Sequence, residues 1–208
     1  MMILDPATTP RSELYAFLIR AIAPRPIAWV STISAKHKLN LAPYSFFNGV
    51  SSKPPAILFV CSRQDDGGKK HTLLNIEENG QFVVNMVPES LGEVMNITAT
   101  EFPHGISEFE KAGLTSAPSE RVLPPRLAES PISFECELHD LMQVGADEVG
   151  SGTIVVGRIV LVHADESILK DGKIDYDKYH PIGRMGGMEY TRTRDRFTMI
   201  RKKYTPDM

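Results

Sequence analysis

A polar loop between two apolar segments carries the residue types that a phosphate group requires. It spans positions 62–72, after a run of β-branched residues and before a helical pattern. A phosphate dianion needs positive charge and several hydrogen-bond donors, and basic side chains, glycine amides and a helix start can supply both. The candidate side chains are Ser62, Arg63, Lys69, Lys70 and Thr72. Because the Gly-x-x-x-x-Gly-Lys-Ser/Thr spacing of a P-loop is absent, a solvated basic loop is the alternative.

Other chemical signatures are weak. The six histidines show no His-x-x-x-His pair, and no Gly-x-Gly-x-x-Gly motif follows a predicted strand. Neither a zinc site nor a Rossmann dinucleotide site is therefore indicated. Cys61 and Cys136 lie far apart in strand-like runs, without Cys-x-x-Cys spacing. We predict two buried free thiols and no metal site.

Length and composition predict a single domain over residues 1–208. The chain is 42% hydrophobic and 24% charged, which is ordinary for a protein that buries a sizeable core. A net charge of -3 gives no reason to expect nucleic acid or an anionic membrane as a partner. No apolar run approaches the ~18 residues of a membrane span and the N-terminus lacks a signal-peptide pattern, so we predict a cytoplasmic protein.

The elements that must position the loop begin with a helix and a strand-rich block. Apolar residues at helical spacing predict a short amphipathic helix from Ser12 to Ala23, with Ser12 as N-cap and Pro24 as the stop. The segment 24–62 is rich in β-branched and aromatic residues, which predicts three strands, the second over Asn40–Asn48. That strand mixes small, hydroxylated and aromatic residues, which suits a flat ring lying against the backbone.

The remaining pattern adds strands with few helices. We predict helices at His71–Glu78, Glu89–Thr98 and Ser107–Ala112, strands at Phe82–Val87, Ile132–Val144, Gly152–Ala164 and Tyr190–Ile200, and a loop from Ile168 to Gly187. The segment 100–126 is a surface excursion that could form a lid or a dimer contact. The apolar run 153–162 indicates cover by a second subunit. The strand spacing favours a closed or nearly closed antiparallel barrel.

Several motifs together give the chain a family resemblance. They are Arg25–Thr32, Asn40–Asn48, Ser62–Arg63, Lys70–Leu73, Phe109–Thr115 and Pro181–Gly187, followed by Tyr190. Over nearly its whole length the chain resembles the flavin reductase-like family of FMN-binding split-barrel proteins. Within the family it is most similar to the reductase components of two-component, FMN-dependent monooxygenases of the nitrilotriacetate type. The resemblance implies a mainly β, Greek-key split barrel with short flanking helices, and a homodimer with flavin near the subunit interface.

The resemblance also implies which residues bind the cofactor. Arg63, Lys70 and Thr72 match the positions that hold the FMN phosphate, and two strands match those that run along the flavin ring. The full predicted set is Trp29, Val30, Ser31, Thr32, Ala42, Pro43, Tyr44, Ser45, Phe46, Ser62, Arg63, Lys70, Thr72, Arg184 and Tyr190. The family often has Lys-Asp-Thr where this chain has Lys70-His71-Thr72, and we interpret His71 as a solvent-facing helix residue.

The predicted activity needs no catalytic side chain. Hydride transfer between a nicotinamide and a flavin requires two stacked flat rings, without a nucleophile or a metal. His180 could help to close the pocket or meet the dinucleotide, and a structural role for it is at least as well supported. The resemblance implies an NAD(P)H-dependent FMN reductase that supplies reduced flavin to a partner monooxygenase, with FAD or riboflavin as possible further substrates. The alternatives are a protein that retains FMN and acts on a small substrate, and an FMN-binding module without turnover.

Overall fold

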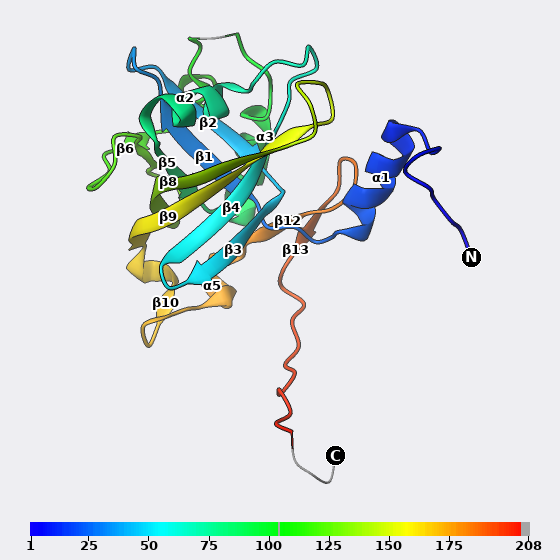
Figure 1. The fold of residues 1–208 in the computed structure, drawn as a ribbon. Coiled ribbons are helices and arrows are strands. Elements are labelled where there is room, and N and C mark those ends of the chain that lie inside the picture. Colours follow the sequence, from blue (N-terminus) through cyan, green and yellow to red (C-terminus); the bar gives the residue numbers. More distant parts are fainter. Residues whose placement is uncertain (104, 205–208) are drawn as a thin grey trace.

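Seven antiparallel strands form the main sheet, in the order β2-β1-β5-β8-β9-β4-β3 (Figure 1). This computed structural model describes residues 1–103 and 105–204. The strands are β1 Ala28–Ile33, β2 Leu39–Tyr44, β3 Phe47–Ser52, β4 Pro55–Ser62, β5 Gln81–Asn85, β8 Ile132–Val144 and β9 Gly152–Ala164. β4 and β5 follow each other in the chain but are separated by β9 and β8 in the sheet, a crossover of the Greek-key type.

The connection between β2 and β3 shows that the sheet is rolled into a barrel. These strands lie at opposite ends of the sheet, yet only Ser45 and Phe46 join them. The outer strands of a flat seven-stranded sheet would lie about 29 Å apart, whereas the chain from Tyr44 to Phe47 reaches at most about 11 Å. The Tyr44 ring of β2 packs on the Phe59 ring of β4, with centroids 5.1 Å apart. The two ends of the sheet therefore meet, which confirms the predicted mainly β barrel.

The strand block near the N-terminus differs from its prediction in one respect. It holds four strands instead of three, because the expected strand Asn40–Asn48 breaks at Ser45–Phe46 and continues as β3. The break occurs where the chain passes from one end of the rolled sheet to the other. The Val60 amide donates to the Phe46 carbonyl at 2.9 Å, which fixes the start of β3 against β4. We call this junction of β2, β3 and β4 the seam.

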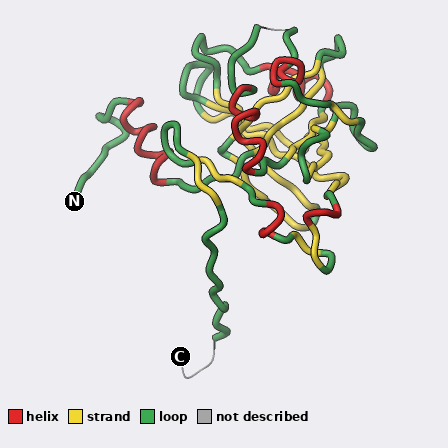
Figure 2. The backbone as a smooth tube through the Cα atoms, turned by 180° about the vertical axis from the view of Figure 1, so that it is seen from behind, coloured by secondary structure: helices red, strands yellow, loops and turns green. Residues whose placement is uncertain are grey.

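Short helices cover the barrel (Figure 2). α2 (His71–Asn79) begins at the predicted residue, buries its Leu73 and Ile76 in the core with strand residues, and ends at Gly80, which adopts the left-handed conformation favoured after a helix. The predicted helix Glu89–Thr98 is instead a 3₁₀ turn, η1 (Glu89–Leu91), followed by α3 (Gly92–Ile97). Beyond these, α4 (Glu108–Ala112) confirms the short helix in the surface excursion, which also holds the small ladder of β6 (Ser116–Ala117) and β7 (Arg126–Leu127).

The first helix lies beside the barrel and not within it (Figure 1). α1 spans Arg11–Ala21, so the prediction that Ser12 caps it is wrong: Pro10 occupies the cap position, without a side-chain hydrogen bond. The helix ends three residues before Pro24 because the Ile22 amide donates to Leu18 and closes the last turn. None of its residues is buried, and its exposed apolar side chains include Tyr15, Phe17 and Leu18.

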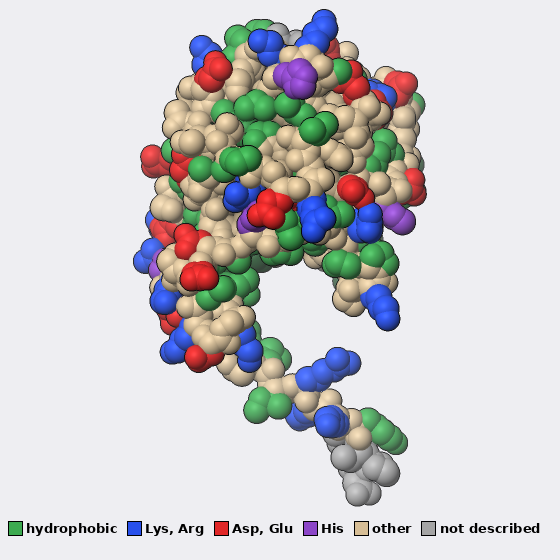
Figure 3. Space-filling view, turned by 90° about the vertical axis from the view of Figure 1, so that its left-hand side faces the viewer, with side chains coloured by type: hydrophobic (Ala, Val, Ile, Leu, Met, Phe, Trp, Pro, Cys, Tyr) green, Lys and Arg blue, Asp and Glu red, His purple; other side chains and the backbone are tan. Residues whose placement is uncertain are grey.

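The late region contains more regular structure than predicted. The segment expected to be a loop from Ile168 to Gly187 holds η2 (Glu166–Ile168), β10 (Leu169–Lys170), β11 (Lys173–Ile174), α5 (Tyr176–Tyr179) and β12 (Ile182–Arg184). The expected last strand is only β13 (Tyr190–Arg192), which pairs with β12. The residues after it form an arm that leaves the body, with Lys and Arg side chains beside hydrophobic ones (Figure 3).

Two expectations about chemistry can be compared with this fold. Cys61 and Cys136 are both buried and free, as predicted. Burial raises the pKa of the Cys61 thiol to about 12, so it stays protonated near neutral pH. Within residues 1–103 and 105–204, no helix has the length and apolar character to cross a membrane, and no cluster of acidic, His and Cys side chains could hold a metal.

Candidate functional site

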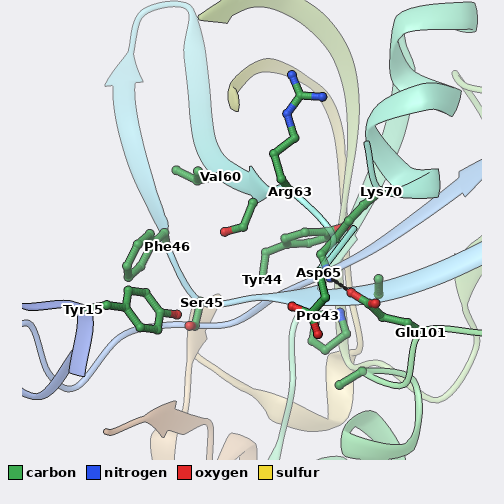
Figure 4. A pocket seen from close by; sticks show the side chains of 13 residues that line it. Tyr15, Pro43, Tyr44, Ser45, Phe46, Val60, Arg63, Asp65, Lys70 and Glu101 are labelled. Carbon is green, nitrogen blue, oxygen red and sulfur yellow. Dashed lines mark hydrogen bonds and ion pairs between the residues drawn. The ribbon is translucent and has the colours of Figure 1, made fainter. Parts of the chain in front are cut away.

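A cavity of about 290 Å³ opens at the seam (Figure 4). Figure 4 shows Tyr15, Ser45 and Phe46 at one end and Lys70, Asp65 and Glu101 at the other, with Tyr44 between them. Its walls come from α1, the end of β2, the end of β4, the basic loop and the segment after α3: Tyr15, Ala42, Pro43, Tyr44, Ser45, Phe46, Val60, Ser62, Arg63, Asp65, Lys70, Ala99 and Glu101. Two predicted groups, the basic loop and the second strand, thus meet on one cavity.

Arg63 follows directly after β4 and lines this cavity. Its side chain is only 6% exposed and pairs through one nitrogen with Asp147, which lies between β8 and β9. Its Nε atom is buried and has no hydrogen-bond partner in the described structure. Since buried donors in native proteins are almost always paired, this N–H indicates a partner that the protein itself does not supply.

Of the other residues predicted to bind the phosphate, Lys70 lines the cavity and Thr72 does not. Lys70 lines the cavity and donates to the Glu101 carboxylate at 2.9 Å, an exposed pair that a ligand could displace at little cost. Thr72 is 1% exposed and accepts from Asn40 Nδ2 at 2.8 Å, which ties α2 to β2. It lines only a small adjoining hollow of about 40 Å³. His71, the first residue of α2, is half-buried and lines the same hollow.

Tyr44 lies in the middle of the cavity floor. Its ring is buried against Phe59, and its hydroxyl is buried without a hydrogen-bond partner of good geometry in the described structure, although Thr72 and Cys61 lie nearby. Burial raises the pKa of this phenol well above its usual value, so the O–H remains available as a donor. Glu108 is also buried close by and accepts from the Leu41 amide at 3.0 Å, and burial raises the pKa of its carboxyl.

The four predicted residues of β1 do not line the seam cavities. Trp29, Val30, Ser31 and Thr32 are each 0% exposed; Val30 belongs to the core between the strands, and Trp29 to a second core cluster with residues of α3 and α4. Their polar groups are paired with protein atoms: Trp29 Nε1 donates to Thr98 at 2.8 Å, and Ser31 donates to the Pro125 carbonyl at 2.5 Å. β1 pairs with β2 over its whole length, so its observed role is to position the strand that carries Pro43 and Tyr44.

A second cavity, of about 230 Å³, continues from the first. The two share Tyr15, Pro43, Tyr44, Ser45 and Ala99, so they form one depression along the seam. The predicted residues Arg184 and Tyr190 line this second part from β12 and β13, and the Arg184 guanidinium lies 4.5 Å from the Tyr190 ring centroid. The lining contains two arginines and, among the described residues, no Asp or Glu. This end of the depression is therefore electropositive.

Arg25 is a site residue that sequence reasoning missed. It is 5% exposed, and its guanidinium donates to the carbonyls of Ile19 at 2.5 Å, Ile22, and Met185 at 2.9 Å, and to Ser45 Oγ at 3.4 Å. It thereby joins α1, the loop after β12 and the seam. Burial lowers the pKa of this side chain, but a guanidinium stays charged at any ordinary pH. The family motif contains this arginine, yet its acceptors are mostly backbone atoms, which no sequence pattern reveals.

Tyr15 was also missed, and His180 lies elsewhere. Tyr15 reaches both seam cavities from α1, a helix predicted only as a lead-in. His180 lines a different cavity, together with Glu89 and Tyr179, that shares no residue with the seam cavities. The suggestion that His180 closes the flavin pocket therefore has no support from this geometry.

The residues of the depression fit a phosphorylated ligand with a flat ring. Arg63, with its unpaired Nε, and the nearby Lys70 are the basic residues of the cavity wall, while Tyr44, with its unpaired hydroxyl, Pro43 and Phe46 form a partly apolar floor. The volumes of about 290 and 230 Å³ together lie within the range of small-molecule sites. Both unpaired atoms belong to positions that the sequence assigns to FMN.

Comparison with known proteins supports the same kind of ligand. Residues 20–183 match the family described as flavin reductase like domain. Nitrilotriacetate monooxygenase component B from Bacillus cereus is 33% identical, with a TM-score of 0.91 over 96% of this chain and 98% of that protein. The 2-nitrobenzoate 2-nitroreductase of Pseudomonas fluorescens is 31% identical, with a TM-score of 0.85 over 99% of this chain and 98% of the other.

A sequence relative agrees with the structural ones. An uncharacterized protein of Aquifex aeolicus strain VF5 is 42% identical over 185 residues, which cover 88% of this chain and 92% of the relative. The family match covers most of the chain, includes the seam residues, and supports an oxidoreductase that works with a flavin. The chain therefore belongs to the flavin reductase-like domain family and has that family's split-barrel fold.

Proposed function

We propose that the protein is an FMN reductase that binds FMN in the seam depression and accepts hydride from NAD(P)H. The observation that carries the proposal is Arg63, which lines the larger seam cavity and has a buried Nε atom without a hydrogen-bond partner in the described structure, in a member of the flavin reductase-like family. Arg63 and Lys70 would hold the terminal phosphate through charge-assisted hydrogen bonds, with Ser62 beside them. Thr72 would act indirectly, by tying α2 to the strand that carries the cavity floor.

The chain's own residues would orient the ring and exclude water. A bound flavin supplies hydride acceptance at its ring, a reaction that the protein side chains cannot perform. Pro43, Tyr44 and Phe46 would cover apolar ring surface, and the Ser45 hydroxyl and Tyr44 O–H are polar groups within the same wall. Tyr15 would close the depression from α1. None of these roles requires a side chain that transfers a proton during hydride transfer.

The reductant would reach the flavin from the electropositive part of the depression. The sequence has no Rossmann motif, so a nicotinamide dinucleotide has to bind over the flavin itself. Arg184 donates to the Gly187 carbonyl through one terminal nitrogen and has further N–H groups for a diphosphate. This assignment gives Arg184 and Tyr190 to the reductant and leaves the FMN phosphate to Arg63 and Lys70.

The proposed partners and location follow from relatives and composition. Similarity to a monooxygenase component B over nearly the whole of both chains supports delivery of reduced flavin to a monooxygenase. We also propose a homodimer, because α1 and the arm after β13 expose apolar side chains that a second copy would cover. The apolar run of β9 remains a further reason for the dimer: β4 and β8 pair with its edges, but its Val162 side chain is 53% exposed. A cytoplasmic location remains part of the proposal.

A second candidate is a flavoenzyme that keeps FMN and reduces a small organic substrate. The similarity to a 2-nitrobenzoate 2-nitroreductase, at 31% identity over nearly the whole of both chains, favours it. An FMN-binding protein without turnover is the third candidate.

Anaerobic reduction separates these candidates. The protein is loaded with FMN, and the flavin absorbance is followed while NADH or NADPH is added without oxygen. The reductase proposal expects rapid bleaching with at least one nicotinamide, followed by transfer of reduced FMN to a second, flavin-free protein that serves as acceptor. Bleaching without release of FMN supports the second candidate. Absence of bleaching with both nicotinamides contradicts the reductase proposal and supports the third.

A further inference from the structure

A third cavity lies apart from the seam. Its volume is about 490 Å³, larger than either seam cavity, and none of its lining residues lines those two. Its walls come from η1 and the residue before it, the segment before β8, the end of η2, the end of α5 and the start of the arm: Pro88, Glu89, Ser90, Glu129, Pro131, Ile168, Lys178, Tyr179, His180 and Arg194. The proposed flavin chemistry uses no part of it.

Like the seam cavity, this cavity is lined by residues that have buried polar atoms without a hydrogen-bond partner. Five buried side-chain polar atoms lack a hydrogen-bond partner in the described part of the chain. Two of them, Tyr44 Oη and Arg63 Nε, belong to residues of the seam cavity, and two others, Tyr179 Oη and His180 Nδ1, belong to adjacent residues that line the third cavity. Tyr179 is only 5% exposed. Unpaired buried groups are rare in native proteins, and their gathering on a cavity wall indicates a bound partner.

The charged groups of this cavity differ in the hydrogen bonds and ion pairs that they form with the rest of the protein. Glu89 accepts from Arg192 and, at 2.6 Å, from Arg194, so its charge is compensated. Glu129 accepts from the Thr115 amide at 2.9 and 3.2 Å. Lys178 makes a long hydrogen bond of 3.4 Å to the Leu169 carbonyl and, among the described residues, forms no ion pair. Lys178 is therefore the cation on this wall whose charge no described carboxylate compensates, whereas Arg194 pairs with Glu89.

The available groups indicate the chemistry of the ligand. Lys178, the Tyr179 hydroxyl and, in the tautomer that carries its proton on Nδ1, His180 are three donors on consecutive residues of one wall, and donors of this kind bind the oxygens of a carboxylate. The remaining wall includes the apolar side chains of Pro88, Pro131 and Ile168. We propose that this cavity binds a small organic carboxylate with a ring-sized apolar body, as a ligand separate from the flavin and its reductant.

Calorimetry with phenylacetate tests the proposal, with neutral phenylacetamide as its matched partner. The full-length protein is titrated with each compound, with and without saturating FMN. We expect one phenylacetate per chain and about tenfold or greater preference over the amide, because a charge-assisted hydrogen bond is lost in the amide. FMN should leave the affinity unchanged. Absence of binding at millimolar concentration, or equal affinity for both compounds, would show that water alone fills the cavity.

Two variants assign the binding to this wall. Tyr179→Phe removes the unpaired hydroxyl and keeps the ring, and Lys178→Gln removes the charge; each should weaken phenylacetate binding about tenfold. Tyr176→Phe is the matched control, because Tyr176 lies in the same helix with its side chain half exposed. Thermal melting without ligand shows whether the variants fold. Unchanged affinity in both Tyr179→Phe and Lys178→Gln, or competition by FMN, would place the compound elsewhere and overturn the proposal.

Discussion

Arg63 pairs only part of its guanidinium with the protein. One terminal nitrogen pairs with Asp147, whose side chain is 75% exposed, while Nε faces no protein acceptor. The exposed partner holds the guanidinium in place without neutralising it fully, because water screens such a pair. Arg63 is in this way oriented in advance, and a phosphate would gain a fixed donor without the cost of ordering a long side chain.

We predict that Arg63→Ala weakens FMN binding and leaves riboflavin binding unchanged. A hydrogen bond between a charged donor and phosphate contributes ~1.5 to 3 kcal/mol, or roughly a tenfold to hundredfold change in affinity. Riboflavin has the same ring without the phosphate, so it reports on damage to the cavity. Lys69→Ala is the control, because Lys69 pairs with Glu77 and does not line the cavity. Equal losses for the two flavins, measured by fluorescence quenching, would mean that Arg63 only supports the fold.

For Arg25 we expect a substitution to affect FMN and riboflavin binding equally, in contrast to Arg63. Lysine keeps the charge but cannot reach carbonyls in α1 and in the loop after β12 at the same time, since it lacks the planar fork. Arg25→Lys should therefore weaken FMN and riboflavin equally, by about tenfold, and speed hydrogen exchange in α1. Arg126→Lys, which changes one exposed contact to the Pro118 carbonyl, is the control. A loss confined to FMN would identify Arg25 as a phosphate ligand and contradict a positioning role.

Among the elements, the long strands were the most predictable. β8 and β9 have the predicted bounds, because β8 lies between Pro131 and Gly145 and β9 is a thirteen-residue run rich in β-branched residues. The break after Tyr44 was not predictable, because its sequence still favours a strand and the break arises from closure of the barrel. The short helices η2 and α5 were missed although the Asp165 and Asp175 side chains cap them, accepting from the Ser167 and Asp177 amides at 2.8 and 2.9 Å. An Asp before each of these two helices was the available signal.

For the site too, the sequence predicted residues in contiguous motifs and missed those whose positions depend on contacts far away in the chain. The sequence motif predicted Arg63, Lys70 and the end of β2, because those residues occur in contiguous segments with distinctive chemistry. It assigned β1 to the ring, since a motif does not show which face of a strand is turned toward the interior. It missed Tyr15, because the position of α1 depends on contacts with a loop that lies far away in the sequence.

The strand β8 provides a test of pH dependence through Glu135. This carboxylate is 0% exposed and accepts from the amides of Glu120 and Arg121 at 2.9 and 2.6 Å and from His163 at 2.6 Å. Burial alone would raise its pKa, but these hydrogen bonds outweigh burial and lower the pKa. A lowered folded-state pKa means that the stabilisation is present above the unfolded value, about 4.3, and is lost as the pH falls below it.

We therefore predict that Glu135→Gln lowers the melting temperature strongly at pH 7 and by less near pH 3. The loss at neutral pH should be ~1.5 to 3 kcal/mol, the worth of a hydrogen bond to a charged group. Glu137→Gln is the control on the same strand, because Glu137 forms an exposed pair with Arg158 that contributes little. A destabilisation by Glu135→Gln that stays constant from pH 7 to pH 3 would show that shape, and not charge, matters at this position.

At the scale of the whole molecule, the apolar surface of α1 and of the arm predicts self-association. Phe17 on α1 is 52% exposed, and Phe197 and Ile200 on the arm are 84% and 89% exposed. Light scattering at micromolar concentration should give roughly twice the 23.1 kDa chain mass. Phe17→Ser and removal of the residues after Arg192 should each shift the population toward monomer. A monomer with full flavin occupancy would contradict the proposed dimer.

The closure of the sheet at the seam has a consequence for kinetic stability. The depression is lined by Tyr15, Tyr44, Arg63 and Arg184, which come from distant parts of the chain and meet only after the ends of the sheet have joined. Such long-range contacts form late in folding, so FMN should bind the native state and not the transition state. At a concentration 100 times its dissociation constant, FMN should slow unfolding in denaturant about hundredfold and leave the refolding rate unchanged. Faster refolding with FMN would show that the seam closes before the rest of the barrel.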